Sequence, residues 1–522
     1  QAEASVAFEL AYQYFDTALS LFSKDSWQNH YQLILELHNH KAEAAYLSGN
    51  IEESYSVVND IFANAQNILD KAKAWKTKLF LHKVKGEIKE TIEAGIEALS
   101  NFGFHISLKN SRYVVFWELT KTDFLLRQYP PSRIEALPPM TNKEHLAIIE
   151  LLDEMMSAAY IYGNNLFPII ICKIINVSLQ NGLNSTFPLA LLSYASLHIN
   201  IRGKISKGYN YGKTALVLND KNPQEKSKAK VFAVYHMFIH HWQNPLQSSL
   251  THLSESYKHF LALGDFEFAG ISIASYAGYA LFSDKNLGNI HKEAVSYYET
   301  IKTLKVANPT HRMQLYLQLV KNLSHNVDHP TKLSGDFFEE ETAVSILESN
   351  KNYFALFLYY CFKLILSYLF GDFKTALKHV KAFEQFQAGS NGMFSYQVFS
   401  TYDALAHLAA YPKLTKQEQR SALTHIKTIQ KKIRIWKKHT PINHEHRWHI
   451  IEAEYHRVVT RNTKKALRHY KEAISNANQN GFVSFEAIGN ELLGKYYLSQ
   501  KEEDFAEFYL QKALLKYQQW GA

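Results

Sequence analysis

Small and apolar residues recur along this chain with the spacing of one helix face, and the pattern returns about every forty residues. A small residue is followed by larger partners four and seven positions later, as in Ala376, Val380 and Phe383. These offsets place the three side chains on one face of an α-helix, where the small residue lets a neighbouring helix approach closely. The same phase begins at Ala11, Ser54, Thr91, Gly208, Ser249, Ala294, Ala376, Ala422, Ala466 and Ala506.

Turn signals separate these helices from a preceding apolar segment. Glycine occupies the turn at Gly49, Gly86, Gly203 and Gly371, as is common just after a helix ends. The pattern therefore predicts an all-α fold, a right-handed α-solenoid of helical hairpins with about a dozen repeats of roughly 34 to 47 residues. The strict tetratricopeptide (TPR) signature, with Trp and Leu-Gly in the first helix, is missing, so the repeats are described as TPR-like.

Two proline pairs interrupt the repeat between residues 129 and 141. Proline disfavours regular helix at its own position and at the one before it. We therefore predict N-terminal helical repeats over 1–128, an irregular Pro-rich connector with a kink at 129–141, and the main TPR-like superhelix over 142–522. Thr141 is predicted to cap the next helix in a capping box with Glu144.

One apolar segment, 353–370, contains a charge at its middle, Lys363. A charge at the centre of a bilayer is costly, and the segment falls where the repeat places a first helix. We therefore predict a buried core helix and no membrane span. The weaker repeat just before it carries Glu340 at the usually small position.

Composition agrees with a folded, soluble protein. Hydrophobic residues make up 46% of the 522 residues, and 57 Lys and Arg against 49 Asp and Glu give a net charge of +8. This mild excess does not favour nucleic-acid binding. The two cysteines, Cys172 and Cys361, are too few for a disulfide framework, which favours a reducing, cytoplasmic compartment. Because the chain lacks an initial Met and opens on the second helix of a repeat, we expect an excerpt of something longer.

No catalytic constellation is found in the sequence. Phosphate-binding glycine loops, nucleophile elbows and kinase motifs are all missing, so we expect no catalytic residues, no cofactor and no enzyme activity in this chain. His236 and His240 have a spacing that can bind zinc, but no third ligand lies nearby in the sequence. His444 and His446 do not match the His-Glu-x-x-His pattern of zinc proteases. The sequence therefore predicts no metal site.

Aromatic and histidine residues gather on predicted first helices of adjacent repeats. Such helices line the concave groove of a solenoid, where ligands and partners bind. The competing interpretation, for most of these residues, is core packing. The candidate ligand or partner surface consists of Tyr235, His236, His240, His241, Trp242, Tyr276 and Tyr279.

Several segments, 26–37, 42–49, 137–141, 209–216 and 517–522, together resemble a known family. They are similar to the helical-repeat region of very large bacterial signalling proteins. In that family a serine/threonine-kinase-like domain and a STAND-type AAA ATPase module precede the helical region, and a GAF domain and often a sensor histidine kinase or a cyclase follow it. The resemblance covers the whole chain but rests on structural motifs. It therefore implies a position between switch and output domains, and no catalytic residue is carried over.

The sequence thus predicts a non-catalytic sensor or scaffold arm of a multidomain signalling ATPase or kinase. The arm would bind a protein partner, or neighbouring domains of the same polypeptide, and relay that event to the ATPase and output domains. The alternative is a helical sensor that binds a small-molecule effector, like those of STAND transcriptional activators.

Overall fold

The structure is a computed structural model that describes residues 8–522, apart from 24, 163–164, 223, 305 and 391. Within the described residues, 26 α-helices and four short 3-10 helices form, and the β-type contacts are two isolated bridges. Contacts divide the chain into two compact units, described separately below: residues 1–194, 221–227 and 349–352, and residues 195–220, 228–348 and 353–522. The predicted all-α class is confirmed.

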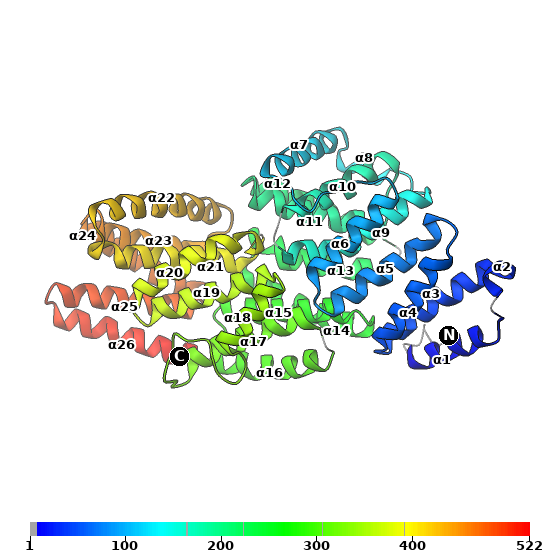
Figure 1. The fold of residues 1–522 in the computed structure, drawn as a ribbon. Helices are drawn as coiled ribbons and strands as arrows, with labels where there is room; N and C mark the ends of the chain where they lie inside the picture. Colours follow the sequence, from blue (N-terminus) through cyan, green and yellow to red (C-terminus); the bar gives the residue numbers. More distant parts are fainter. Residues whose placement is uncertain (1–7, 24, 163–164, 223, 305, 391) are drawn as a thin grey trace. The chain divides into compact units, whose positions relative to one another are not determined.

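The first compact unit contains antiparallel hairpins formed by helices that follow one another in the chain (Figure 1). Helix α3 packs on α4, α5 on α6, and both α5 and α6 pack on α9. The helices are α1 (Phe8–Ser20), α2 (Ser26–Asn29), α3 (Tyr31–Leu47), α4 (Ile51–Asn64), α5 (Ile68–Val84), α6 (Ile88–Asn101), α7 (Arg112–Gln128), α8 (Pro131–Glu135), α9 (Lys143–Tyr162) and α10 (Leu166–Asn181).

The second compact unit continues the hairpin pattern, with α11 (Phe187–Asn200) and α13 (Glu225–Phe238) each divided between the two units. Helix α23 packs on α24, and α25 packs on α26. The remaining helices are α12 (Ile205–Asp220), α14 (Ser249–Ala262), α15 (Phe266–Phe282), α16 (Leu287–Thr303), α17 (Ala307–Ser324), α18 (Glu340–Ser349), α19 (Tyr353–Leu369), α20 (Phe373–Phe383), α21 (Phe394–Ala410), α22 (Lys416–His439), α23 (Pro441–Val458), α24 (Thr463–Gln479), α25 (Val483–Ser499) and α26 (Glu503–Trp520). Four 3-10 helices complete it: η1 (His240–Trp242), η2 (Leu246–Ser248), η3 (Glu384–Ser390) and η4 (Tyr411–Lys413).

The predicted helix faces form the core. Ala376, Val380 and Phe383 are all buried on α20. The small positions allow the close helix contact that the sequence predicts, as Gly95 of α6 shows: a Cβ atom there would overlap the side chain of Met155 on α9. The TPR-like hairpin fold is therefore confirmed in its packing as well as in its helix content.

The predicted glycine turns adopt the backbone conformation that requires glycine. Gly371, between α19 and α20, has φ +79°, a left-handed conformation that costs glycine little and other residues more. Its N–H bonds back to the carbonyl of Tyr368, and the next N–H, of Asp372, bonds to that of Ser367. This ends the first helix of the hairpin and lets the second begin.

The Pro-rich connector is more regular than the sequence predicts. It contains one short helix, α8, because Pro131 takes the first helical position, where a missing N–H costs nothing. The following segment is held by an isolated bridge, in which Met140 N donates to Leu183 O at 2.8 Å and Leu183 N donates to Pro138 O at 2.8 Å. The connector lies within the first compact unit, and the subdomain boundary proposed for it stays a prediction.

The predicted cap of the next helix is displaced by one residue. The backbone N–H of His145 donates to the side-chain oxygen of Asn142 at 3.0 Å, and Asn142 O accepts from Leu146 N. Asn142 therefore caps α9, and the prediction of Thr141 was wrong. Asparagine is at least as good a cap as threonine, and the sequence pattern did not discriminate between these adjacent residues.

The two charged residues that disturb the repeat pattern bind each other. Lys363 Nζ, on the otherwise apolar helix α19, lies 3.0 and 2.9 Å from the carboxylate oxygens of Glu340 and 2.7 Å from Thr331 O. Helix α19 is buried along most of its length, as predicted. Among the helices that the structure describes, none combines the length and apolar character needed to span a bilayer.

Candidate functional site

The predicted aromatic and histidine residues lie mostly inside the second compact unit. All of them except His240 are buried, and His241 is completely inaccessible. His241 Nδ1 lies 3.1 Å from Tyr279 Oη, and its Nε2 lies 3.3 Å from Gln397 Nε2 of α21. These side chains join helices that are far apart in the sequence. Their use as a ligand or partner surface stays a prediction. In this packing only His240, among the seven residues, is partly exposed.

Asn443 fastens the same region to α23. Its Nδ2 donates to His241 O and to Asn244 O, each at 2.9 Å, and its Oδ1 accepts from Leu246 N at 3.0 Å. The segment around η1 and η2 has irregular backbone whose polar groups need partners. A single buried amide therefore satisfies three of them.

Histidines 236, 240 and 252 stack against one another beside this segment. The ring centroid of His236 lies 4.1 Å from that of His252 and 4.7 Å from that of His240. Burial, together with the neighbouring imidazoles, lowers the pKa of His236 to about 3 and that of His240 to about 4. The ring of His236 is tilted by 49° to that of His240 and by 32° to that of His252, and the three residues are not among the groups of converging ligand atoms found in the described residues.

Helix α7, in the first compact unit, buries both of its acidic residues and one threonine. Glu118 and Asp123 are 8% and 5% exposed, and Thr122 is fully buried. Each has a partner: Lys173 Nζ lies 2.8 Å from Glu118, Tyr194 Oη donates to Asp123 at 3.0 Å, and Thr122 Oγ1 donates to Asn176 at 3.0 Å. The buried side of α7 is thus unusually polar.

The opposite side of α7 presents aromatic rings to solvent. Tyr113, Trp117 and Phe124 are 87%, 68% and 62% exposed. They lie four and seven positions apart, and therefore on one face of the helix. The exposed charged residues of α7 are Arg112, Lys121 and Arg127, all basic, because the acidic ones are buried. We call Tyr113, Trp117 and Phe124, with these three basic residues, the outer face of α7. A large exposed apolar patch of this kind marks an interaction surface.

Sequence reasoning did not identify this face. A stripe of aromatic residues at helical spacing predicts the buried side of a helix, and on α7 that inference is reversed. The sequence did contain a second stripe, since Glu118 and Thr122 lie four residues apart on the other face. That face can be buried when Lys173 and Asn176 lie close enough to pair with these two side chains. Only the packing of α7 on α10 decides between the two faces.

A separate pocket of about 430 Å³ lies between α4, α5 and α6 in the first compact unit. Phe62 and Trp75 form its apolar wall, and Lys71, Lys78 and Glu97 contribute charge. Lys78 Nζ lies 4.9 Å from the centroid of the Trp75 ring. The indole N–H of Trp75 has no acceptor among the described residues. The volume is within the range of small-molecule sites.

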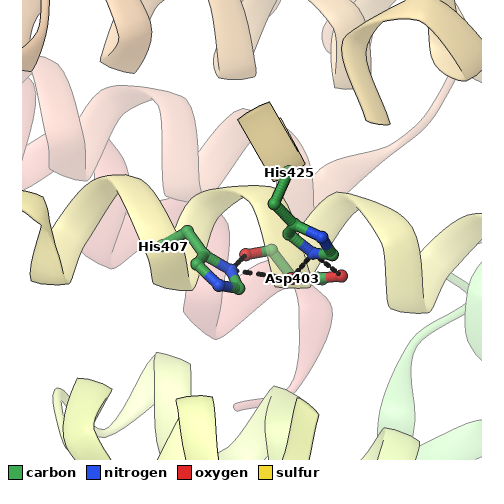
Figure 2. Close-up of side chains that lie close together, drawn as sticks. All are labelled: Asp403, His407 and His425. Atoms are coloured by element: carbon green, nitrogen blue, oxygen red, sulfur yellow. Dashed lines mark hydrogen bonds and ion pairs between the residues drawn. The ribbon is translucent and has the colours of Figure 1, made fainter. Parts of the chain in front are cut away.

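A buried carboxylate between two histidines is found on α21 and α22 (Figure 2). Asp403 Oδ1 lies 2.8 Å from His407 Nδ1, and Asp403 Oδ2 lies 2.9 Å from His425 Nε2. Hydrogen bonding to Asp403 raises the pKa of His425. Burial acts to raise the pKa of Asp403, but its two histidine partners outweigh this and lower it. The geometry is that of a proton-sharing ion pair which joins two helices.

The fold defines a TPR-like helical-repeat protein, and part of its sequence is similar to a region of a known protein. No protein-family model matches the chain. It is 22% identical, over 298 residues, to the hybrid signal transduction histidine kinase G of Dictyostelium discoideum, a match that covers 51% of this chain and 9% of that protein. The chain therefore spans less than a tenth of this relative.

Two solved structures show similarity at low identity. A Rap protein complexed with competence and sporulation factor is 10% identical, with a TM-score of 0.31, and the match covers 87% of this chain and 99% of the other. A circular tandem repeat protein with novel repeat topology is 10% identical, with a TM-score of 0.15, and the match covers 98% of this chain and 95% of the other.

Proposed function

We propose that this chain is a non-catalytic arm of a multidomain signalling protein and that it binds a protein partner through the outer face of α7. The observation that carries the proposal is the inverted arrangement of α7, in which acidic residues are buried and aromatic residues are exposed. Exposing three aromatic rings forfeits the free energy of burying them, about 1.5 to 3 kcal/mol each for large apolar side chains. A partner that covers the rings would recover this free energy.

The chemistry of the outer face indicates what such a partner presents. Aromatic rings and arginine are the residues most often found at the centre of protein interfaces. Arg112, Lys121 and Arg127 surround the rings with positive charge, and no exposed acidic residue of α7 offsets it. The matching surface is therefore an apolar segment flanked by Asp or Glu. We infer that a protein with an acidic amphipathic segment is the partner.

The signalling context rests on the similarity to a hybrid histidine kinase, in which a region like this one is a small part of a much longer chain. In our proposal the arm relays partner binding to neighbouring ATPase and output domains, as the family resemblance of the sequence implies. The binding of a partner and the relay of that binding to other domains can be tested independently. Binding can be tested on this chain alone, and the relay requires the longer protein.

Photo-crosslinking tests the partner proposal directly. A photoreactive phenylalanine analogue replaces Trp117 in the protein expressed in its source cells. The matched control carries the same analogue at Ile435, an exposed residue of α22. We expect a crosslinked protein from position 117 only, in an acidic segment that mass spectrometry can locate. Purified unlabelled chain should compete for the partner and reduce this crosslinking. The double variant Trp117→Glu with Phe124→Glu should not compete, and its melting temperature should be unchanged because both side chains are exposed.

Three results would contradict the proposal. Equal crosslinking from positions 117 and 435 would show that the outer face of α7 does not bind a specific partner. Co-sedimentation with phosphatidylserine vesicles that Trp117→Glu abolishes would assign the face to a membrane surface instead. ATP hydrolysis or kinase activity by the purified chain, with a rate that survives further purification, would contradict the non-catalytic assignment.

A small-molecule sensor is the second candidate function, and the pocket beside Trp75 favours it. The two lysines select an anionic ligand, and Phe62 and Trp75 select one with an apolar portion. Native mass spectrometry of the chain purified from its source cells would detect such a ligand. Lys71→Gln with Lys78→Gln should weaken its retention because these changes remove both positive charges and keep the aromatic wall, and retention that is unchanged in this variant would exclude the pocket.

A further inference from the structure

Three possible metal-ligand atoms converge on the α23–α24 hairpin of the second compact unit. His449 Nδ1 of α23 lies 2.8 Å from His469 Nδ1 of α24 and 3.0 Å from Glu472 Oε2. His469 Nδ1 lies 3.5 Å from the same Glu472 oxygen. The three atoms therefore form a triangle with sides of 2.8, 3.0 and 3.5 Å, although His449 and His469 come from different helices.

The size of this triangle fits one face of a zinc tetrahedron. Zinc binds imidazole nitrogen and carboxylate oxygen at about 2.0 to 2.2 Å, and neighbouring ligand atoms in a tetrahedral site are then about 3.3 Å apart. The three observed distances lie on both sides of this value. A cation can therefore contact all three atoms at normal bond lengths with little movement of the side chains.

We infer that His449, His469 and Glu472 form a zinc(II) site on the α23–α24 hairpin. Two imidazoles and one carboxylate are a donor set that suits zinc, and three protein ligands leave the fourth position for water. This inference is independent of the partner proposed for α7, because the residues, the compact unit and the measurement all differ.

The environment keeps these histidines in the form that binds metal. Burial is the main cause that lowers the pKa of both His449 and His469 to about 4, so both imidazoles are neutral at neutral pH. A metal ligand must be deprotonated, and no proton has to be removed here when the metal binds. The side chains of the two histidines are 11% and 10% exposed, whereas that of Glu472 is 40% exposed, which provides a path for an ion.

A second set of ligands adjoins the first. Glu452 and His456 of α23 group with His469 so that one donor atom from each lies within 4.8 Å of the others. The ring of His456 is stacked with that of His469, with the centroids 5.7 Å apart. Both residues adjoin His469 and are placed to orient its ring, as outer-shell partners of metal-bound histidines do.

The Asp403 cluster of Figure 2 also brings two histidines and a carboxylate together, with one donor atom from each within 4.8 Å of the others. His407 Nδ1 is already 3.0 Å from the backbone oxygen of Asp403, and the carboxylate raises the pKa of His425. The raised pKa favours the protonated form of His425, which does not bind a cation, and the backbone oxygen occupies Nδ1 of His407. This cluster therefore supplies a matched control: two histidines and a carboxylate on neighbouring helices, whose imidazoles are engaged by a proton and by a backbone oxygen.

The alternative to a metal is a shared proton. One of the two Nδ1 atoms would carry a hydrogen and donate it to the other nitrogen or to Glu472. Nearby cations favour this alternative, since Arg468 Nε lies 3.9 Å from Glu472 and Lys437 Nζ lies 3.7 Å from Glu445. The acidic groups Glu445 and Glu452 oppose their charge. Stoichiometric binding of zinc distinguishes the two cases.

The experiment is zinc titration of the purified full chain after removal of metal with a chelator. Isothermal calorimetry with ZnCl2, in competition with a chromogenic chelator, gives affinity and stoichiometry. We expect one zinc per chain, and we expect His469→Ala to weaken binding at least about 100-fold. His425→Ala, the control in the Asp403 cluster, should bind zinc as the wild type does. Circular dichroism establishes that both variants are folded.

Cobalt provides a second measurement that does not depend on the loss of a side chain. Co²⁺ bound to the wild type should give the intense visible absorption of a tetrahedral site, and zinc should displace it. No stoichiometric zinc binding, or binding that His469→Ala leaves intact, would overturn the assignment in favour of the shared proton. Zinc binding that is lost in His425→Ala alone would move the site to the Asp403 cluster and would also overturn it.

Discussion

Replacing Lys363 by methionine should destabilise the second compact unit by leaving Glu340 without its cation. Lys363 is 7% exposed and binds both oxygens of Glu340 as well as Thr331 O. Methionine keeps much of the length of the side chain and its packing on α19 but removes the ammonium group. The Glu340 carboxylate then stays partly buried without its counterion, because Leu333 N still holds it in place.

The structure sets the expected magnitude. Removing one partner of a buried ion pair costs about 3 to 5 kcal/mol. Glu340 keeps the hydrogen bond from Leu333 N, at 2.8 Å, and its side chain is 19% exposed. These two features place the expected loss near the lower limit, about 3 kcal/mol. The double variant Lys363→Met with Glu340→Gln should recover part of this loss, because the uncompensated charge is gone.

The pH dependence separates the charge from the packing. Burial acts to raise the pKa of Glu340, but the hydrogen bonds and charge of Lys363 outweigh burial and hold that pKa below its usual value. A depressed carboxyl pKa gives stabilisation that is present above the unfolded pKa, about 4.3, and is lost as the pH falls through the folded pKa. Without Lys363 the pKa should rise, so the difference between wild type and variant should shrink on acidification toward about pH 4.

Hydrogen exchange monitored by mass spectrometry measures the effect locally. Peptides from α18 and α19 should open with a free energy about 3 kcal/mol lower in Lys363→Met. Lys332→Met is the matched control, because Lys332 forms an exposed ion pair with Glu341, at 3.2 Å, close to the same place. It should leave the exchange of α18 and α19 unchanged. An equal effect of the two substitutions, or a Lys363→Met effect that does not vary with pH, would refute the reasoning.

Three further results are expected. Asn443→Ala removes the partners of three backbone groups and should lower the free energy of unfolding by about 3 kcal/mol, as measured by urea denaturation; an unchanged urea midpoint would mean that water replaces the amide. Gly278→Ala should destabilise by about 1 to 3 kcal/mol despite the higher helix propensity of alanine, because the new Cβ would overlap the Tyr316 ring, and thermal melting measures this. Burial lowers the pKa of His444 and His446 well below the usual value, so the unfolded state binds more protons and stability should fall as the pH drops below about 6.5. The fall should approach about 1.4 kcal/mol per pH unit for each histidine, and melting temperatures measured between about pH 7 and pH 5 that stay constant would contradict it.

Much of the fold was predictable because its rules are local. The offsets of four and seven placed Ala376, Val380 and Phe383 on one buried face, and the glycine turns followed from a backbone conformation that few other residues adopt. The cap of α9 was wrong by one residue, because Thr141 and Asn142 can both cap a helix and the choice depends on where the chain leaves its bridge with Leu183.

The candidate sites were less predictable because their residues meet through packing. His449 and His469 lie twenty positions apart, and only the antiparallel pairing of α23 with α24 brings their nitrogen atoms to 2.8 Å. The predicted aromatic and histidine patch contains the residue types of a binding surface, but those residues are also the types that fill a core. Composition cannot show whether a ring faces a groove or a neighbouring helix.

The amino-acid sequence by itself determined that this protein is a stack of TPR-like helical hairpins, because helical periodicity and turn chemistry act over a few residues. Tertiary structure decided which face of each helix is covered. On α7 the partners Lys173, Asn176 and Tyr194 draw Glu118, Thr122 and Asp123 inward and leave the aromatic rings outside. The physical reason is that burial favours polar groups only when partners from other helices satisfy them, and the position of those partners is a property of the whole fold.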